Sequence, residues 1–406
     1  MRVIVVNCGS SSIKYETFDV NGLIPVTAGL LENIGGPDSR LKHRYRTADG
    51  AWHEQVEKRP VADHREGFAC ILDVSGRARA DSAQMNIFGV GHRVVHGGEK
   101  FTRPVIIDES SLDTLRALVP LAPLHNPANI TGITVMREML PEVLQVAVFD
   151  TAFHQTMPPE AFLYALPYEY YQDHGVRRYG FHGSSHRYVA GEAARHLNAP
   201  PGKLNLITLH LGNGASAAAI ERGKCVDTSM GLTPLEGLVM GTRCGDLDPA
   251  IPFFLAGKTG RPVEEMEAVL NRESGLKGLC GVNDMREIQR RAGEGNARAR
   301  LALDMFCYRV KKYIGAYYAA LGTVDAIVFT GGIGENSAAV REKSCRGLSA
   351  LGIMVDPGRN NRVAGPVTEI QDDRGRVKVL VIPTNEELEI ARQTIATIKA
   401  GRNPEA

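Results

Sequence analysis

Two arginines stand where a guanidinium group could bind an anion. Arg243 lies within Gly241-Thr-Arg-Cys-Gly-Asp-Leu-Asp248, and Arg93 follows an apolar run and stands between two histidines. An arginine among loop glycines is poorly placed for a structural ion pair, but it can bind a carboxylate or phosphate through two parallel N–H groups. We therefore expect Arg243 to be functional, with Asp246 and Asp248 holding its loop. For Arg93 alone, the functional and structural interpretations both stay open.

Two acidic residues follow apolar runs that have the pattern of buried strands. Asp150 comes directly after Gln145-Val-Ala-Val-Phe149, and Glu386 follows residues 377–382 through Pro-Thr-Asn. Carboxylates at strand ends beside a polyphosphate suit Mg²⁺, which takes most of its ligands from water. Capping of the following helix is the alternative for both residues. His182 lies in a glycine-bounded loop, where its ring could contact a transferring phosphoryl group, and we expect most other histidines to be structural.

Glycine, serine and asparagine end three apolar runs, at residues 7–12, 210–216 and 330–336. Such turns let backbone N–H groups approach an anion closely, so three of them favour a bound nucleotide phosphate. After the first two turns a second strand follows, which predicts the same hairpin in each half of the chain and hence a duplicated fold. Lys14, on the second strand of the first hairpin, is either a phosphate ligand or a solvated lysine. No Walker A loop or dinucleotide-binding fingerprint occurs.

The elements that must position these residues follow from apolar periodicity and from helix start signals. Strands are expected as a meander over 1–31 and at 86–91, 145–149, 204–211, 324–329 and 377–382. Helices are expected at 66–80, 109–119 (beginning at Ser110 or Ser111), from 128, and at 262–273, 284–292, 296–321 and 386–399. The basic segment 38–65 fits no pattern. A chain of 406 residues exceeds what one core usually organises, so we expect two domains.

Composition excludes several classes of protein. Lys plus Arg minus Asp plus Glu is 47 − 46 = +1, so no global field draws the chain to nucleic acid or to a membrane, and we expect neither as a partner. The seven cysteines are scattered and show no C-x-x-C spacing, which argues against a disulfide framework and structural zinc. Because no signal-peptide pattern or long apolar run is visible, we expect a cytoplasmic protein.

The whole chain resembles the acetate kinase family. The matching segments keep the family's order: Asn7–Lys14, His92–Gly98, Pro123–Pro127, Phe149–His154, Arg178–Gly183, His210–Ser216, Gly241–Arg243, Gly331–Asn336 and Thr384–Glu387. The resemblance implies a duplicated actin-like, ribonuclease H-like α/β fold with domains 1–150 and 151–385 and an active-site cleft between them. The final helix is expected to pack back on the first domain. A homodimer is implied, as is reversible transfer of the ATP γ-phosphoryl group to acetate, giving acetyl phosphate and ADP.

The resemblance also implies a role for each matching position. Asn7 and Glu386 are similar to the family's Mg²⁺ site, which could also hold Mn²⁺. Asp150, His182 and Arg243 correspond to catalytic residues, and the substrate pocket corresponds to Arg93, Val95, Leu124, Phe181 and Pro234. The ATP or ADP contacts correspond to Lys14, His210, Leu211, Gly212, Asn213, Gly214, Asp284, Met285, Arg286, Gly331, Gly332, Ile333, Gly334 and Glu335. Ser184 and Cys244 depart from the common family pattern by small changes.

Three rival functions remain beside this one. A propionate or short-chain fatty acid kinase differs only in pocket volume, where one methylene is worth about 1–3 kcal/mol. A non-metabolic ATPase of the same superfamily would have no need for both Arg93 and Arg243. A carbohydrate kinase would use Asp150 as a base for a hydroxyl. A carboxylate is already a nucleophile at neutral pH, so we expect Asp150 to orient an arginine or the magnesium hydration shell.

Overall fold

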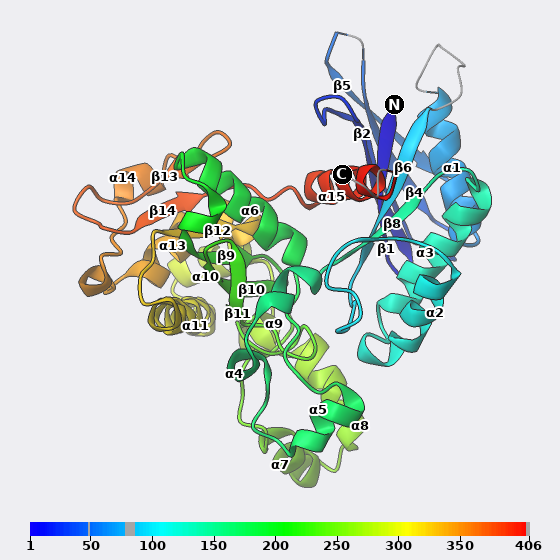
Figure 1. Ribbon diagram of the computed structural model, residues 1–406. Coiled ribbons are helices and arrows are strands. Elements are labelled where there is room, and N and C mark those ends of the chain that lie inside the picture. The colour runs from blue at the N-terminus through cyan, green and yellow to red at the C-terminus, as the bar shows by residue number, and fades with distance from the viewer. Residues whose placement is uncertain (48, 78–85, 403–406) are drawn as a thin grey trace. The chain divides into compact units, whose positions relative to one another are not determined.

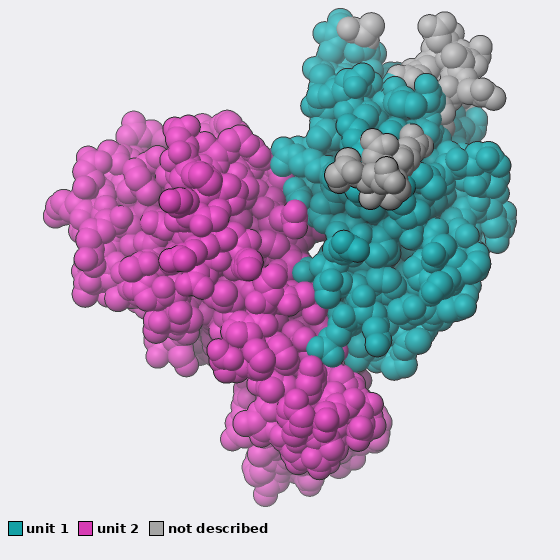
Figure 2. Space-filling model, in the orientation of Figure 1, with its two compact units in different colours: residues 1–152, 385–406 teal, residues 153–384 magenta. Residues whose placement is uncertain are grey.

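The computed structural model describes residues 1–47, 49–77 and 86–402. The chain divides into two compact units, unit 1 (Met1–Ala152 with Asn385–Ala406) and unit 2 (Phe153–Thr384), which Figure 2 colours separately. The chain therefore passes between the units twice, at Ala152–Phe153 and at Thr384–Asn385. Each unit contains one β-sheet with helices packed against it (Figure 1).

The sheet of unit 1 has eight strands in the order β5-β4-β3-β2-β1-β6-β8-β7. Strands β1 to β5 form an antiparallel meander, β6 and β8 run parallel to β1, and β7 pairs antiparallel with β8. The strands are β1 Arg2–Cys8, β2 Ser12–Asp19, β3 Pro25–Glu32, β4 Arg40–Arg46, β5 Trp52–Lys58, β6 Ile87–Val94, β7 Val105–Ile106 and β8 Gln145–Phe149.

The sheet of unit 2 has six strands in the order β11-β10-β9-β12-β14-β13. Its first three strands form an antiparallel meander, and β12 and β14 run parallel to β9. The strands are β9 Asn205–Leu211, β10 Ala215–Glu221, β11 Lys224–Thr228, β12 Ala326–Thr330, β13 Thr368–Glu369 and β14 Lys378–Val381.

The two sheets share one topology. The order β3-β2-β1-β6-β8 in unit 1 corresponds to β11-β10-β9-β12-β14 in unit 2. In both, two antiparallel strands lie on one side of the central strand, which is β1 or β9, and two parallel strands lie on the other. This repeated order is the ribonuclease H-like arrangement of actin-like proteins. The duplicated α/β fold predicted from the two hairpins is confirmed.

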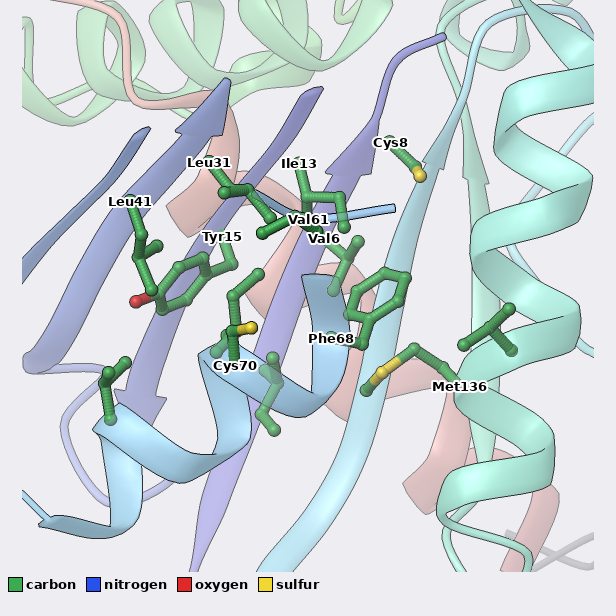
Figure 3. Packing of buried hydrophobic residues seen from close by; sticks show 14 of the residues in the cluster. Val6, Cys8, Ile13, Tyr15, Leu31, Leu41, Val61, Phe68, Cys70 and Met136 are labelled. Carbon is green, nitrogen blue, oxygen red and sulfur yellow. The ribbon is translucent and has the colours of Figure 1, made fainter. Parts of the chain in front are cut away.

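Helices cover both faces of the sheet in unit 1. Helices α1 (His64–Arg77) and α3 (Asn126–Met139) bring Phe68 and Met136 against Val6 of β1 (Figure 3). Val3 and Val5 point to the opposite face, because alternate residues of a strand do so, and there they pack against α15 (Glu386–Arg402). Helix α2 (Glu109–Ala117) packs beside α3.

Two glycines of β6 let helix α15 lie close to the sheet. A Cβ atom on Gly89 would collide with Ile398, and one on Gly91 would collide with Thr394. Any larger residue would push the helix outward and open the core that Ile390 and Ile395 complete. The close approach holds the C-terminal helix in unit 1, although more than 200 residues separate it from β8 in the chain.

The helices of unit 2 include α6, whose Val189 and Ala193 pack against Leu206 and Val328 of the sheet, and the long α11, which contacts β9 and β10. Figure 1 shows α4, α5, α7 and α8 gathered at one end of this unit. The helices are α4 Pro159–Phe162, α5 Tyr168–His174, α6 Gly183–His196, α7 Ile251–Thr259, α8 Val263–Ala268, α9 Gly275–Cys280, α10 Met285–Gly293, α11 Ala297–Leu321, α12 Gly331–Asn336, α13 Ala338–Cys345 and α14 Pro357–Asn360.

Several elements differ from the sequence-based expectation. The basic segment 38–65 forms β4 and β5, because both continue the ladder of β3 and bury Leu41 and His43. The N-cap of α2 is Asp108, whose carboxylate accepts the Ser111 N–H at 2.7 Å, and not Ser110 or Ser111. Residues 331–336, expected as a turn, form α12, and α3 begins two residues early, at Asn126.

Two further differences concern helices. The sequence did not predict helix α7, because its residues are mostly apolar and show no helical period. Residues 78–80 of the first expected helix lie outside the described residues. Within the described ranges, no helix combines the length and the apolar character needed to cross a bilayer.

Candidate active site

Arg93 and Asp150 form a buried ion pair at the ends of two neighbouring strands of unit 1. Strands β6 and β8 are parallel, with Val94 paired to Phe149, so Arg93 and the residue after β8 reach the same edge of the sheet. Nε of Arg93 donates to Oδ1 of Asp150 at 3.0 Å, and Nη2 donates to Oδ2 at 2.6 Å. The pair is bidentate, which fixes the plane of the guanidinium group.

Burial and the opposite charges of the two groups act against each other in this pair. Burial alone would lower the pKa of Arg93, but Asp150 and Glu386 raise it above its ordinary value. Burial pushes the pKa of Asp150 upward, and Arg93 opposes this rise. Among the described residues, no acceptor takes a hydrogen bond from Nη1 of Arg93, so this group can bind a further anion. Both carboxylate oxygens of Asp150 accept hydrogen bonds from Arg93, so Asp150 orients this guanidinium group.

Carboxylates outnumber cations around this ion pair. Glu386, the first residue of α15, has its pKa raised by burial and by Glu387, and Arg93 and Lys14 pull it down. Lys14 forms an ion pair with Glu387. Burial and Glu387 also raise the pKa of Glu16 to about 7. Four carboxylates therefore share three cations, Arg93, Lys14 and Arg44, in this part of unit 1.

This charge balance bears on the expected metal site. Asn7, at the end of β1, is paired in register with Lys14. Carboxylate and amide oxygens are the donors that Mg²⁺ prefers, and a divalent cation would offset the surplus negative charge, so the residues fit the ion. Among the described residues there is no group of three or more His, Cys, Asp or Glu side chains arranged to hold a metal. A site with two protein ligands, completed by water and phosphate, would not form such a group.

Replacing Glu16 with glutamine is expected to stabilise the protein above pH 7 but not at pH 5. The folded protein holds the Glu16 proton more tightly than the unfolded chain, because its pKa rises from 4.5 to about 7. Ionisation therefore lowers the free energy of unfolding as the pH increases through this interval. With allowance for solvent screening, the variant should exceed the wild type by roughly 2 kcal/mol at pH 8.

Urea unfolding at pH 5 and pH 8 in magnesium-free buffer measures this difference. Glu54→Gln is the matched control, because Glu54 lies in the same sheet and pairs with Lys42 at the surface. An equal difference between Glu16→Gln and wild type at both pH values would show that Glu16 does not titrate as described.

Buried asparagines of α3 hold the strand end that carries Val95. Asn129 accepts the Val95 N–H at 3.1 Å and donates to the Cys8 carbonyl at 2.8 Å, and Asn126 bonds both backbone groups of His96. Sequence reasoning missed these two roles, because the partners are distant in the chain. The available signal was Asn126, directly after Leu-His in a matched segment.

The four apolar residues expected in the substrate pocket are divided between the units. Val95 is buried and Leu124 is exposed in unit 1, whereas Phe181 is buried and Pro234 is half-buried in unit 2. The carbonyl of Phe181 accepts Nε2–H of His154 at 2.9 Å, and that of Pro234 accepts Nη1–H of Arg243 at 3.2 Å. Pro234 therefore lies beside Arg243 in unit 2.

In unit 2, His182 and Arg243 converge on one glycine. A Cβ atom placed on Gly214 would lie 3.5 Å from Nε2 of His182 and 3.6 Å from Nη1 of Arg243. His182 precedes α6 with a positive φ of 58°, stacks on His210 with 4.3 Å between ring centroids, and bonds Ser216 Oγ through Nδ1 at 2.9 Å. The turn after β9 thus lies beside an imidazole and a guanidinium group.

Arg243 has no carboxylate partner among the described residues. Its Nη1 donates to the Pro234 carbonyl, and burial lowers its pKa. Asp246 instead accepts the Gly237 N–H at 2.8 Å and pairs with Arg309 at 3.3 Å, and Asp248 accepts the Ala250 N–H at 2.9 Å. The two aspartates hold the loop, as expected. A partly buried cation that lacks a counter-ion is suited to an incoming anion.

The hydroxyl group of Ser216 connects His182 to a second histidine, His186, which is also hydrogen bonded to Thr208. Ser216 Oγ also contacts Nε2 of His186 at 2.8 Å, and Nδ1 of His186 contacts Thr208 Oγ1 at 2.7 Å. Burial lowers the pKa of His186 well below its ordinary value, so this ring is neutral. His186 is thus a structural histidine, and its network keeps the His182 ring in place.

A cavity of about 660 Å³ in unit 2 brings together residues from three of the expected nucleotide-binding segments. Its lining includes Gly212, Asn213, Asp284, Met285, Arg286, Gly332 and Ile333. The lining also includes four residues that were not named individually as nucleotide contacts, namely Asn283, Gln289, Asn336 and Ser337. These four neighbour the expected positions or lie one helical turn away, so helix periodicity could have found them.

The other expected nucleotide contacts have different surroundings. His210, Leu211, Gly214, Gly331, Gly334 and Glu335 are not in the lining, and Lys14 belongs to unit 1. Gly331 has a φ of +75°, and a Cβ atom there would lie 2.8 Å from the Leu211 carbonyl oxygen, so glycine is required. Asp284 caps α10 by accepting the Arg286 N–H at 2.8 Å and also pairs with the Arg286 guanidinium. Gly331 and Asp284 thus fix the backbone next to residues that line the cavity.

The duplicated sheet places the chain in the actin-like class of α/β proteins. Within it, the family model described as the acetokinase family matches residues 2–392, and the chain belongs to that family. The chain is 62% identical over 400 residues to the acetate kinase of Syntrophobacter fumaroxidans, covering 98% of this chain and 97% of the relative. It is 51% identical over 404 residues to the acetate kinase of Streptomyces coelicolor, covering 100% and 98%.

Solved structures give the same result. The crystal structure of Porphyromonas gingivalis acetate kinase superposes with a TM-score of 0.92 at 44% identity, covering 98% of this chain and 99% of that one. A propionate kinase from Francisella tularensis gives 0.90 at 42% identity, covering 97% and 99%. The fold and the family expected from the sequence are therefore confirmed.

Proposed function

We propose that the protein is an acetate kinase, which transfers the γ-phosphoryl group of ATP reversibly to acetate, giving acetyl phosphate and ADP. The family supports this, since the curated relatives described above are acetate kinases. The observation that carries the proposal is Arg243, a partly buried guanidinium group with no carboxylate partner among the described residues, beside His182 and Gly214. A phosphoryl group in transfer is the anion that this arrangement suits.

The proposed reaction needs no general base. A carboxylate oxygen of acetate attacks the γ-phosphorus in line, the bond from that phosphorus to the bridging oxygen breaks, and ADP leaves with the electron pair. Nη1 of Arg93 would bind the acetate carboxylate, because its other two donor groups are held by Asp150. Val95, Leu124, Phe181 and Pro234 are proposed to surround the methyl group. Asp150 keeps the plane of Arg93 constant while charge moves to the leaving phosphate.

Arg243 and His182 are proposed to stabilise the phosphoryl group during transfer. Acetate and ATP repel each other electrostatically, so cationic and hydrogen-bonding groups must offset this repulsion. The nucleotide itself is proposed to occupy the 660 Å³ cavity, with its phosphates near the turns at Gly212 and Gly332. Asn7 and Glu386 are proposed to hold Mg²⁺, or Mn²⁺ in its place. The chemistry that the bound ion supplies is neutralisation of triphosphate charge.

Removal of the Glu386 carboxylate is expected to raise the Mg²⁺ requirement. Glu386→Gln keeps the shape of the side chain but loses its charge, so half-maximal activity should need at least about tenfold more Mg²⁺, equivalent to about 1.4 kcal/mol of lost binding. Titration of activity with Mg²⁺ at saturating ATP measures this shift. Glu109→Gln is the control, since Glu109 also lies in the first turn of a helix of unit 1 but is exposed. If Glu386→Gln showed the same Mg²⁺ dependence as the wild type, Glu386 would not be a ligand of the metal ion.

Trapping of the product tests the function itself. Purified protein with ATP, Mg²⁺ and acetate should produce acetyl phosphate, which hydroxylamine converts to a coloured hydroxamate. Comparison of kcat/KM for acetate, propionate and butyrate separates acetate preference from propionate preference, and acetate should be highest. Hydrolysis of ATP without any hydroxamate, and without a response to carboxylates, would instead support a non-metabolic ATPase.

A homodimer and a cytoplasmic location are also part of the proposal. Three residues of α7 expose large apolar side chains, namely Ile251, Phe253 and Phe254, and the latter two are more than 60% exposed. Such a patch in unit 2 is typical of a surface that another protein covers. Light scattering during size-exclusion chromatography should give twice the chain mass for wild type and the mass of one chain for Phe253→Glu/Phe254→Glu.

A further inference from the structure

Thr384, the last residue of unit 2 before the chain returns to unit 1, is held by two separate hydrogen bonds. Its backbone N–H donates to Oε1 of Glu335 at 3.1 Å. Its hydroxyl group and that of Ser185 are hydrogen bonded at 2.8 Å. Ser185 is fully buried, and Thr384 is half-buried. The backbone and the side chain of this one residue are therefore fixed by different elements of unit 2.

The two anchoring groups also hold the glycine-rich strand ends. Oε1 of Glu335 accepts the Gly331 N–H at 2.9 Å, so one carboxylate oxygen bridges the first residue of α12 and the backbone of Thr384. Ser185 Oγ is hydrogen bonded to Nδ1 of His210 at 2.7 Å, at the end of β9. Because β9 and β12 are neighbouring strands with Thr330 paired to His210, both strand ends connect to Thr384.

The position of Glu335 is itself held by Arg341, which is almost fully buried. Nη1 of Arg341 donates to the carbonyl oxygens of Gly334 and Glu335, each at 2.9 Å, and Nε donates to Asn360 Oδ1 at 2.8 Å. These bonds fix the last turn of α12, so the Glu335 side chain has a rigid base. A shift at Gly331 must then change the hydrogen-bond geometry at Glu335 Oε1. The hydrogen bond from the Thr384 N–H to the same oxygen atom changes with it.

The residues after Thr384 transmit any such change directly. Asn385 caps α15, because its Oδ1 accepts the Leu388 N–H at 2.9 Å. Glu386 is the first residue of this helix and has the raised pKa described above. One residue thus separates Thr384 from the carboxylate proposed to bind Mg²⁺, and that residue is locked to the helix.

We propose that Glu335, Ser185 and Thr384 are positioning residues that couple nucleotide binding in unit 2 to the placement of Glu386 in unit 1. The inference rests on the proposed function, since it takes the turns at His210–Gly214 and Gly331–Gly332 as the phosphate site. Phosphate oxygens that contact the backbone at Gly331, the first residue of α12, alter the two hydrogen bonds that Glu335 Oε1 accepts. Thr384 then shifts together with the cap of α15, and the carboxylate of Glu386 is set for the metal that accompanies the nucleotide.

Hydrogen exchange measured by mass spectrometry tests this coupling without relying on activity. ADP with Mg²⁺ should slow exchange of the wild-type amides at 384–388 by at least about tenfold, together with those at 210–216 and 330–336. In Glu335→Ala, at an ADP concentration that slows exchange at 210–216 as far as in the wild type, exchange at 384–388 should change less than about twofold. Glu335→Gln should restore the effect, because the amide oxygen can accept the same two N–H groups.

Two further variants complete the design. Glu342→Ala removes a carboxylate from the neighbouring helix α13, where Glu342 pairs with Arg346 at the surface, and it should behave as wild type. Ser185→Ala breaks the second connection with little change in volume. It should reduce the response at 384–388 even if Glu335→Ala does not fold.

The possible failures are distinguishable. If ADP does not slow exchange at 210–216 in the wild type, the proposed nucleotide site is wrong, and the coupling falls with it. If ADP protects that segment normally but Glu335→Ala and Ser185→Ala both transmit full protection to 384–388, the coupling is wrong and the proposed function stands. Loss of protection in Glu335→Gln equal to that in Glu335→Ala would also overturn the bridge.

Discussion

Arg243→Ala is expected to lower kcat by about 10³ while changing the KM for ATP only modestly, since an arginine that stabilises a transferring phosphoryl group is worth roughly 10³–10⁵ in rate. The guanidinium group is partly buried, and burial lowers its pKa, so its charge is costly in the free protein. Asp246 and Asp248 do not offset this cost, because they bond to Gly237, Arg309 and Ala250. The charge is therefore best compensated when an additional anion reaches it.

The measurement separates binding from catalysis. Arg243→Lys should recover only part of kcat, because an ammonium group cannot present two parallel N–H groups to phosphate oxygens. Arg374→Ala is the matched control, since Arg374 is mostly exposed and pairs with Asp372 in a surface turn. An unchanged kcat in Arg243→Ala would refute the proposed role. A large rise in the KM for ATP at constant kcat would indicate ground-state binding instead.

Asp150→Ala is expected to reduce both stability and the use of acetate. The substitution leaves the Arg93 guanidinium without its counter-ion in a mostly buried position, which should cost roughly 3–5 kcal/mol in the free energy of unfolding. Because the plane of Arg93 is then no longer fixed, kcat/KM for acetate should fall by at least about 100-fold, in the range reported for misplaced positioning groups. Urea unfolding and steady-state kinetics measure the two effects separately.

The double variant Arg93→Ala/Asp150→Ala distinguishes the structural role from the functional one. Removal of both charges leaves no guanidinium without its partner at this strand edge, and Lys14 still acts on Glu386, so the double variant should be more stable than Asp150→Ala. It should nevertheless remain unable to use acetate, because the proposed acetate ligand is gone. Equal or lower stability in the double variant would show that the pair does not govern the stability of this strand edge.

The contrast between expected and observed elements follows from the range of the interactions involved. The ends of β1, β9 and β12 were predictable because an apolar run followed by Gly, Ser or Asn is a local pattern. The strands β4 and β5 were not, because their residues are charged and the ladder of β3 decides their structure. Helix α7 was missed for the related reason that its apolar residues have no period.

The candidate site divides in the same way. The types and positions of Arg93, Asp150, His182, Arg243 and Glu386 could be proposed from strand ends, loop glycines and the family resemblance. Their partners could not. Lys14, expected as a phosphate ligand or a solvated residue, pairs with Glu387 on a helix more than 370 residues away in the chain. The bridge made by Glu335 Oε1 likewise joins residues 49 positions apart.

The amino-acid sequence by itself determined the duplicated α/β architecture, the family, and the residue types available for phosphoryl transfer, because these depend on periodicity and short motifs. The tertiary structure alone decided which charges are paired and which are not. Strand register brings Arg93 to Asp150, and the loop after β11 turns Arg243 away from its neighbouring aspartates. Coulomb energies and desolvation depend on distance and burial in space, and neither quantity is encoded in the order of residues along the chain.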